Sequence, residues 1–166
     1  MKYFDSQNEE QVVTKPFLGF GGRDVELQGR EAYRHSASSD LDRFIQPFVS
    51  EVRTRGDRRV LFLEGKVIGH FVRMPAQGGF ISNLAQGGTA HAKPLSAEEE
   101  ELCVKVSNFL AAVGINFAGA DFIGSRVSEI NITSPTGLRS LEALGGSDGS
   151  EAIIEAWEKR AFGQSS

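Results

Sequence analysis

The sequence predicts an α+β fold in which antiparallel sheets are flanked by helices. Two segments, residues 59–73 and 117–133, have the pattern of two strands joined by a short turn. Three others, residues 96–113, 138–144 and 151–162, are expected to be helical. Hairpins of antiparallel strands with helices laid against them define the α+β class.

The N-terminal part is expected to hold a strand, a glycine loop and a return strand. Residues 12–13 begin a short strand that Pro16 ends, and the glycine-rich loop at 19–22 follows it. Residues 24–28 would then pair back as the second arm of a hairpin. For residues 41–49 we expect a helical turn followed by an extended stretch.

The middle of the chain predicts a hairpin and then a long loop. Residues 59–63 and 67–73 read as two strands that the tight turn Glu64–Gly65 joins. From residue 78 to residue 94 the chain loses its periodicity and collects glycine, serine, asparagine and threonine. Loops of this length inside a compact domain are usually functional, so we expect a ligand there.

The elements after this loop have clear signals. Ser96 and Glu99 form a capping box, and apolar residues then recur at helical spacing until Gly114. The second hairpin follows, with strands at 117–123 and 127–133 and a turn through Gly124, Ser125 and Arg126.

Composition favours one compact domain. A chain of 166 residues, 40% hydrophobic and 24% charged, can bury one core but is short for two ordinary domains. We therefore expect a single domain at residues 12–162, with polar tails at 1–11 and 163–166. Cys103 is the only cysteine, which excludes an internal disulfide, and its apolar neighbours predict a buried side chain.

Charge and hydropathy argue against two classes of partner. The 18 basic and 22 acidic side chains give a net charge of -4, which does not favour binding to the phosphate backbone of nucleic acid. No run approaches the roughly 20 apolar residues of a membrane span, and the first ten residues lack the apolar stretch of a signal peptide. We expect a cytoplasmic protein that binds neither nucleic acid nor membrane.

The strongest chemical signal lies in the second hairpin, at Asp121, Glu129 and Asn131. Strand side chains alternate between faces, so Glu129 and Asn131 share one face. A turn at residues 124–126 places Asp121 opposite Glu129, with Cβ atoms roughly 5 Å apart. Such carboxylates repel unless a cation joins them, and magnesium prefers carboxylate oxygens completed by water and phosphate. A nucleotide-metal site is one interpretation, and a solvated acidic sheet face is the other.

A second phosphate signal lies near the N-terminus. Lys15 precedes the glycine loop at 19–22, whose successive N–H groups can form an anion-binding nest. A lysine from the preceding strand would add a point charge. An ordinary hairpin turn explains the same glycines.

Short motifs follow one another along nearly the whole chain, from about Val12 to Phe162: Val13-Thr14-Lys15-Pro16, Gly19-Phe20-Gly21-Gly22, Gly56-Asp57-Arg58-Arg59-Val60, Arg73-Met74-Pro75, Asn83-Leu84-Ala85-Gln86-Gly87-Gly88, Gly119-Ala120-Asp121-Phe122-Ile123-Gly124 and Glu129-Ile130-Asn131-Ile132-Thr133-Ser134-Pro135-Thr136-Gly137. In this order they resemble the ATP-grasp half of prokaryotic glutathione synthetases. The glycine loop alone also fits related ligases that add amino acids to protein tails, whereas the last string is specific to this family.

The resemblance implies an ATP site in which a lysine and the glycine loop close over the phosphates. Backbone groups of residues 46–49 would hold adenine, and an aspartate would reach the ribose. The implied nucleotide-binding residues are Lys15, Gly19, Phe20, Gly21, Gly22, Gln46, Phe48, Val49 and Asp57.

The resemblance also implies roles in the reaction. Asp121, Glu129 and Asn131 would bind Mg²⁺, and Arg73 would balance the phosphates or an acyl-phosphate. Four further residues would lie toward a small peptide or amino-acid substrate: Arg59, Asn83, Ser134 and Thr136. In the family, ATP phosphorylates the carboxylate of γ-glutamylcysteine, and the amine of glycine then attacks.

The chain departs from the family pattern in three ways. Family members are roughly twice as long, and their first half supplies a separate domain, part of the peptide site and another lysine that contacts ATP. Ile81 stands where an arginine is usual, and Leu18 where aspartate is frequent. Two hypotheses follow: a ligase module that works as a homo-oligomer or with a partner chain, and a degenerate, catalytically inactive domain kept for regulation or assembly.

Overall fold

The computed structural model describes residues 11–19, 21–29, 31, 42–146 and 149–163. The chain divides into two compact units, Met1–Ser50 and Glu51–Ser166, and each is described by itself. Within the described residues, no helix combines the length and the apolar character needed to cross a membrane. The single-domain expectation for residues 12–162 stays a prediction.

The first unit holds a three-stranded antiparallel sheet in the order β2-β1-β3. The strands are β1 (Gln11–Pro16), β2 (Glu26–Gly29) and β3 (Arg43–Pro47). Val13 of β1 pairs with Leu27 on one side and with Gln46 on the other. The expected hairpin between the first two strands is therefore confirmed.

The third strand differs from the expectation for residues 41–49. Leu41 lies outside the described residues, and the chain is already extended at Arg43. The helical turn expected there is wrong within residues 42–49, because residues 43–47 pair with residues 12–16 of β1. This long-range pairing, which local sequence does not reveal, selects the strand.

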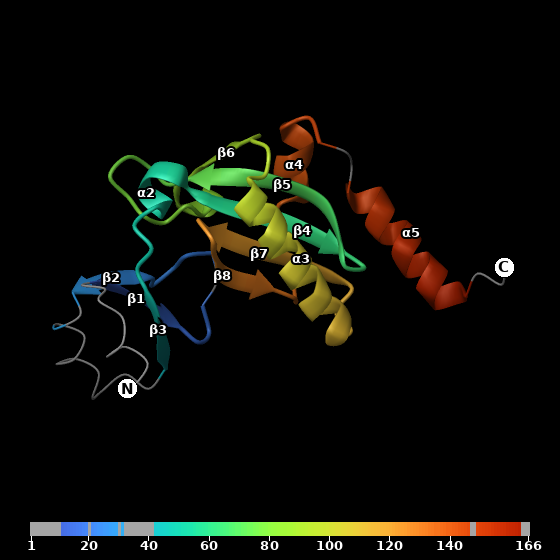
Figure 1. Cartoon of the computed structure of the whole chain (residues 1–166), viewed down its shortest axis with the longest axis horizontal. Helices are drawn as coiled ribbons and strands as arrows, with labels where there is room; N and C mark the ends of the chain where they lie inside the picture. The colour runs from blue at the N-terminus through green and yellow to red at the C-terminus, as the bar shows by residue number, and fades with distance from the viewer. Residues whose placement is uncertain (1–10, 20, 30, 32–41, 147–148, 164–166) are drawn as a thin grey trace. The chain divides into compact units, whose positions relative to one another are not determined.

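The second unit is built on a five-stranded sheet in the order β6-β5-β4-β7-β8, with antiparallel neighbours throughout. Both expected hairpins are present, and their strands β4 and β7 join them into one sheet (Figure 1). The antiparallel α+β architecture is confirmed. The strands are β4 (Asp57–Leu63), β5 (Lys66–Met74), β6 (Thr89–His91), β7 (Phe117–Ile123) and β8 (Arg126–Asn131).

The first of these hairpins has the expected two-residue turn. Glu64 and Gly65 have positive φ angles of 50° and 74°. Positive φ at both central residues is the property of the type I′ turns that match strand twist. The turn and a register shift between Leu61 and Phe62 together set the register in which Asp57 of β4 pairs with Arg73 of β5.

The long segment 78–94 is not wholly irregular. It contains a short 3-10 helix, η1 (Leu84–Gln86), and strand β6, which extends the sheet beside β5. Asn83 caps η1 by accepting a hydrogen bond from the N–H of Ala85 at 2.9 Å. The sequence analysis missed β6 because three residues are too few to show an alternating pattern.

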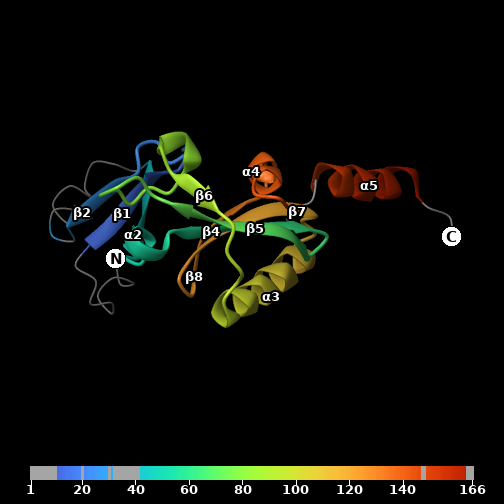
Figure 2. The same cartoon turned by 90° about the horizontal axis from the view of Figure 1, so that it is seen from above.

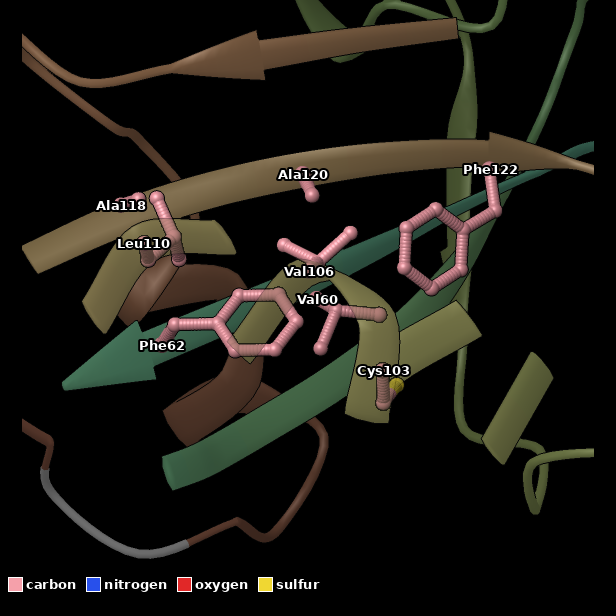
Figure 3. Packing of buried hydrophobic residues seen from close by; sticks show 8 residues of the cluster. All are labelled: Val60, Phe62, Cys103, Val106, Leu110, Ala118, Ala120 and Phe122. Atoms are coloured by element: carbon pink, nitrogen blue, oxygen red, sulfur yellow. The ribbon is translucent and has the colours of Figure 1, made fainter. Parts of the chain in front are cut away.

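Helix α3 (Ala97–Ala112) covers one face of this sheet and carries the expected capping box between Ser96 and Glu99. Its inner side packs on alternate residues of β4 and β7 to form the main core (Figure 3). Cys103 is 6% exposed, and burial raises the pKa of its thiol to about 11, so the expectation of a buried side chain is confirmed. The core residues are Val60, Phe62, Cys103, Val106, Leu110, Ala118, Ala120 and Phe122.

Two further helices follow β8, as expected: α4 (Leu138–Ala143) and α5 (Gly149–Phe162). Figure 2 shows α3 and α4 on opposite faces of the five-stranded sheet. Leu141 of α4 lies so close to Gly69 of β5 that an added Cβ would come within 2.1 Å of its side chain. Helix α5 packs through Ile153 in a second, smaller core.

Candidate functional site

Four charged side chains meet on the face of the sheet opposite α3. They come from three neighbouring strands: Asp57 and Arg59 from β4, Arg73 from β5 and Asp121 from β7. The register places Arg59 opposite Asp121 and Asp57 opposite Arg73. Because strand residues two apart share a face, both acid–base pairs lie side by side.

The pairs have bidentate geometry. Arg59 donates through Nε and Nη2 to the two carboxylate oxygens of Asp121 at 2.5 and 2.8 Å. Arg73 donates in the same way to Asp57 at 2.7 Å for both contacts. A third contact of 2.7 Å, between Arg73 Nη2 and Asp121 Oδ2, joins the pairs into one network. Forked contacts of this kind are the strong form of the arginine–carboxylate interaction.

Burial and neighbouring charges both act on the pKa values of Asp57 and Arg73. Burial raises the pKa of Asp57 to about 6, against the lowering effect of the Arg73 guanidinium. Burial acts to lower the pKa of Arg73, but the carboxylates of Asp121 and Asp57 outweigh it, so the pKa of Arg73 rises. Arg73 is therefore a fixed cation, and its charge favours the ionised form of Asp57.

Glu129 and Asn131 extend this site along β8. Asp121 pairs with Glu129, as the sequence analysis predicted, although the turn is shorter than the predicted 124–126. An irregularity beyond Asp121 restores the register, since Phe122 pairs with Val127. Glu129 is exposed and Asn131 is partly buried.

The cation beside Asp121 is, in this structure, arginine. The sequence left two interpretations of the paired carboxylates, a metal site and a solvated acidic face, whereas in the structure Arg59 and Arg73 both contact Asp121. This contact has no local signal in the sequence, because Arg59 and Asp121 are 62 positions apart and meet only through the pairing of β4 with β7. The charge argument alone therefore does not require magnesium.

The donor set still fits a magnesium ion. Carboxylate and amide oxygens from Asp121, Glu129 and Asn131 lie at successive positions on one face, and magnesium takes such oxygens. Asn131 presents its side-chain oxygen, which accepts a hydrogen bond from the N–H of Ser134 at 3.1 Å. No closed cluster of three or more His, Cys, Asp or Glu side chains occurs among the described residues. An ion here would need further oxygens from water or from a ligand.

The segment that follows β8 closes one side of a cavity. Arg59 donates from Nη1 to the carbonyl oxygen of Thr136 at 3.0 Å, which ties this segment to the charge network. A cavity of about 450 Å³ lies between the segment, β5 and the η1 region. Its lining residues are Phe71, Arg73, Asn83, Leu84, Ala85, Pro135, Thr136, Gly137, Leu138, Arg139 and Ser140.

The structure thus gathers many of the expected site residues in the second unit. Arg73, Asn83 and Thr136 line the cavity, while Asp57, Arg59 and Asp121 belong to the charge network. Ser134 is exposed beside Asn131, and Ile81 is half-buried in the segment before η1. The analysis from sequence did not single out Arg139, whose only local signal is a cation directly after the motif that ends at Gly137.

The remaining nucleotide-binding candidates lie in the first unit. Lys15 is half-buried near the end of β1, and Gly21 and Gly22 have positive φ angles of 67° and 76° in the turn that follows. Phe20 lies outside the described residues, and Gly19 is exposed before it. Gln46 belongs to β3, and Phe48 and Val49 follow that strand, with the N–H of Phe48 bonded to the carbonyl of Gln11.

Comparison with known proteins identifies a family for most of the chain. The family model described as "Prokaryotic glutathione synthetase, ATP-grasp domain" matches residues 1–146. A glutathione synthetase of Prochlorococcus marinus subsp. pastoris is 38% identical over 157 residues, which are 90% of this chain and 51% of that protein. A glutathione synthetase of Agrobacterium fabrum is 33% identical over 160 residues, 92% of this chain and 50% of that protein. The chain spans about half the length of the curated relatives it matches.

Solved structures share the fold at low sequence identity. D-cycloserine synthetase DcsG superposes with a TM-score of 0.67 at 18% identity, covering 92% of this chain and 56% of that one. A D-alanine–D-alanine ligase from Bacillus anthracis complexed with ATP gives a TM-score of 0.60 at 18% identity, covering 92% and 54%. These likenesses establish the ATP-grasp fold.

Proposed function

The chain belongs to the ATP-grasp domain family of prokaryotic glutathione synthetases, and we propose that it binds a magnesium–nucleotide complex and activates a carboxylate for attack by an amine. The observation that carries the proposal is the acidic edge of the sheet, where Asp121 and Glu129 are cross-strand partners beside two buried arginines. Family membership supports an ATP-dependent ligase origin for this edge.

The residues that the family resemblance implies for nucleotide binding would each contact a different part of the nucleotide. Lys15 and the loop Gly19–Gly22 would face the phosphates, since a lysine and a glycine turn provide a point charge and free N–H groups. Backbone groups at Gln46, Phe48 and Val49 would hold the base, and Asp57 the ribose. The pairing of Asp57 with Arg73 would then connect nucleotide binding to the charge network.

Magnesium, when bound, would neutralise phosphate charge and bring the nucleotide to Asp121, Glu129 and Asn131. Glu129 is the exposed acidic member of that set, so its carboxylate is accessible to an incoming ion. Asp121 is fixed in place by its two arginines, which prevents rotation of its carboxylate. This arrangement preorganises one oxygen donor and leaves the other to adjust.

In the proposed reaction, a substrate carboxylate oxygen attacks the terminal phosphorus of ATP and ADP leaves. The resulting acyl-phosphate is then attacked by an amine, which forms the amide bond, releases inorganic phosphate and loses a proton. Arg73, which lines the cavity, would offset the negative charge of the transferred group. Arg59, Asn83, Ser134 and Thr136 would position the peptide or amino-acid substrate.

One observation favours a second candidate, a catalytically inactive nucleotide-binding or structural domain. Both arginines of the charge network already have carboxylate partners, so these four side chains balance one another without a ligand. A domain kept for regulation or assembly would preserve this network for stability alone. Phosphate release in the presence of ATP, magnesium and γ-glutamylcysteine with glycine would separate the candidates, because the inactive domain predicts none.

We further propose a cytoplasmic protein that acts as a homo-oligomer or with a partner chain. Helix α5 exposes Ile154 and Trp157 by 54% and 51%, and apolar surface of this kind is common at interfaces. Light scattering would show a mass above that of one chain, and a single monomeric species at high concentration would contradict the homo-oligomer.

Calorimetric titration with a non-hydrolysable ATP analogue and magnesium tests nucleotide binding. The wild type should bind saturably, and Lys15→Ala should bind about tenfold more weakly through loss of a charge-assisted contact. Lys105→Ala removes the same charge from the exposed side of α3 and should bind as the wild type does. Failure of the wild type to bind would refute a stand-alone nucleotide site.

A further inference from the structure

We propose that Arg139 holds a carboxylate of the substrate in the cavity formed by β5, the η1 region and the segment after β8. The inference rests on the proposed ligase function, since it names a substrate-binding residue for that site. Arg139 is the second residue of α4, is exposed, and lines this cavity of about 450 Å³. Cavities of this size match small organic ligands.

The charges around the cavity single out Arg139. The charged lining residues are Arg73 and Arg139, and no carboxylate lines the cavity. Arg73 is neutralised by Asp57 and Asp121, each at 2.7 Å. Among the described residues, Arg139 has no recorded carboxylate partner, so it is the uncompensated positive charge of the lining. A guanidinium in this state favours an anionic group, and its planar fork matches a carboxylate.

The other lining residues define the kind of molecule that carries this carboxylate. Asn83 uses its side-chain oxygen to cap η1, which leaves its amide N–H groups for a ligand. Thr136 and Ser140 add hydroxyl groups, while Phe71 and Pro135 are apolar. The combination fits an amino acid or a short peptide, with polar backbone groups and a small apolar side chain. An acid lacking these features, such as inorganic phosphate, would make only the charge contact.

The position of Arg139 is set by the fold. Helix α4 is anchored where Leu141 packs against Gly69, so the residues before Leu141 are held over the sheet face that carries Arg73. Arg59 fixes the preceding segment by its bond to the carbonyl of Thr136. Arg139 lines the cavity from α4, whereas Arg73 lines it from β5 and is already paired with two carboxylates. Arg139 would hold a substrate carboxylate other than the reacting one.

The test compares γ-glutamylcysteine, its diamide and inorganic phosphate as probes in titrations of the full chain. The wild type should bind the dipeptide, and Arg139→Ala should bind it about tenfold more weakly. Arg139→Lys should recover part of the affinity, because it restores charge without the fork. The diamide should bind weakly to all three proteins. Lys105→Ala, with the same charge change on the other face of the sheet, should match the wild type.

Nucleotide binding is titrated in the same proteins with the ATP analogue. A failure of this inference can therefore be distinguished from a failure of the nucleotide site. Equal dipeptide affinity in wild type and Arg139→Ala would overturn the inference, as would equal affinity for dipeptide and diamide. Phosphate binding that depends on Arg139 without dipeptide binding would also overturn it, leaving a simple anion site. If the wild type binds the nucleotide but not the dipeptide, only the proposed role of Arg139 is contradicted. If it binds the dipeptide but not the nucleotide, only the proposed nucleotide site is contradicted.

Discussion

At the level of single residues, the charge network depends on each carboxylate having an arginine partner. Asp121 and Arg59 are 6% and 5% exposed, so water does little to screen either charge. A buried pair of this kind adds little net stability compared with apolar residues, but removal of one partner leaves the other charge uncompensated. Removal of any one of the four side chains is therefore unfavourable, and the intact network holds the acidic edge in one geometry.

Asp121→Asn should lower the free energy of unfolding by about 3 kcal/mol, since Arg59 would lose its only carboxylate partner in the network. Urea denaturation measures this change. Glu101→Gln, which removes a charge from an exposed position on α3, should change stability by less than about 0.5 kcal/mol. Equal effects of the two substitutions would show that the network is not formed in solution.

The pKa of Glu99 predicts how the free energy of unfolding depends on pH. Burial acts to raise its pKa, but the hydrogen bonds from Arg58 and Ser96 outweigh burial, and the pKa lies below its usual 4.5. Folded Glu99 therefore binds protons less readily than unfolded Glu99, and the stability it contributes is present above pH about 4.5. That contribution is lost as the pH falls through the lower, folded pKa.

The unfolding free energies of wild type and Glu99→Gln should accordingly differ most above pH about 4.5 and converge below it. Urea denaturation over a pH series would show this convergence. Glu100→Gln, its exposed neighbour, should produce a small difference at all pH values. A difference for Glu99→Gln that does not change with pH would contradict the assigned contacts with Arg58.

At the level of elements, the contact between α4 and β5 positions one wall of the cavity. Gly69 lets Leu141 approach the strand, because any side chain at position 69 would overlap it. Gly69→Ala should destabilise the protein by about 2 kcal/mol through overpacking. Gly29→Ala in β2 is the matched control, as an added Cβ there meets nothing within 4 Å. Comparable thermal stability of the two variants would argue against this packing.

The features that could be predicted from the sequence are those formed by residues close together in the chain. The turn Glu64–Gly65, the capping box at Ser96 and the pairing of Asp121 with Glu129 were all read from residues close in the chain. Strand β6 was missed, and the strand at residues 43–47 was expected only as an extended stretch after a helical turn, because each is formed by pairing with a distant strand. The contact of Arg59 with Asp121 was missed for the same reason.

At the level of the whole molecule, the residues proposed for nucleotide binding are distributed over the two units of the chain. Lys15 and residues 46–49 belong to the first, whereas Asp57 and the acidic edge belong to the second. The identification of these residues rests on family resemblance, and spacing in the sequence alone would not have joined them.

The magnesium dependence of nucleotide binding is the most direct measurement of the central claim. Calorimetric titrations with the non-hydrolysable ATP analogue should give affinity that rises with magnesium in the wild type and in Glu101→Gln. In Glu129→Gln that dependence should be largely lost, because an exposed ligand carboxylate of the acidic edge is removed. The same magnesium dependence in Glu129→Gln and wild type would contradict a metal site at Asp121, Glu129 and Asn131.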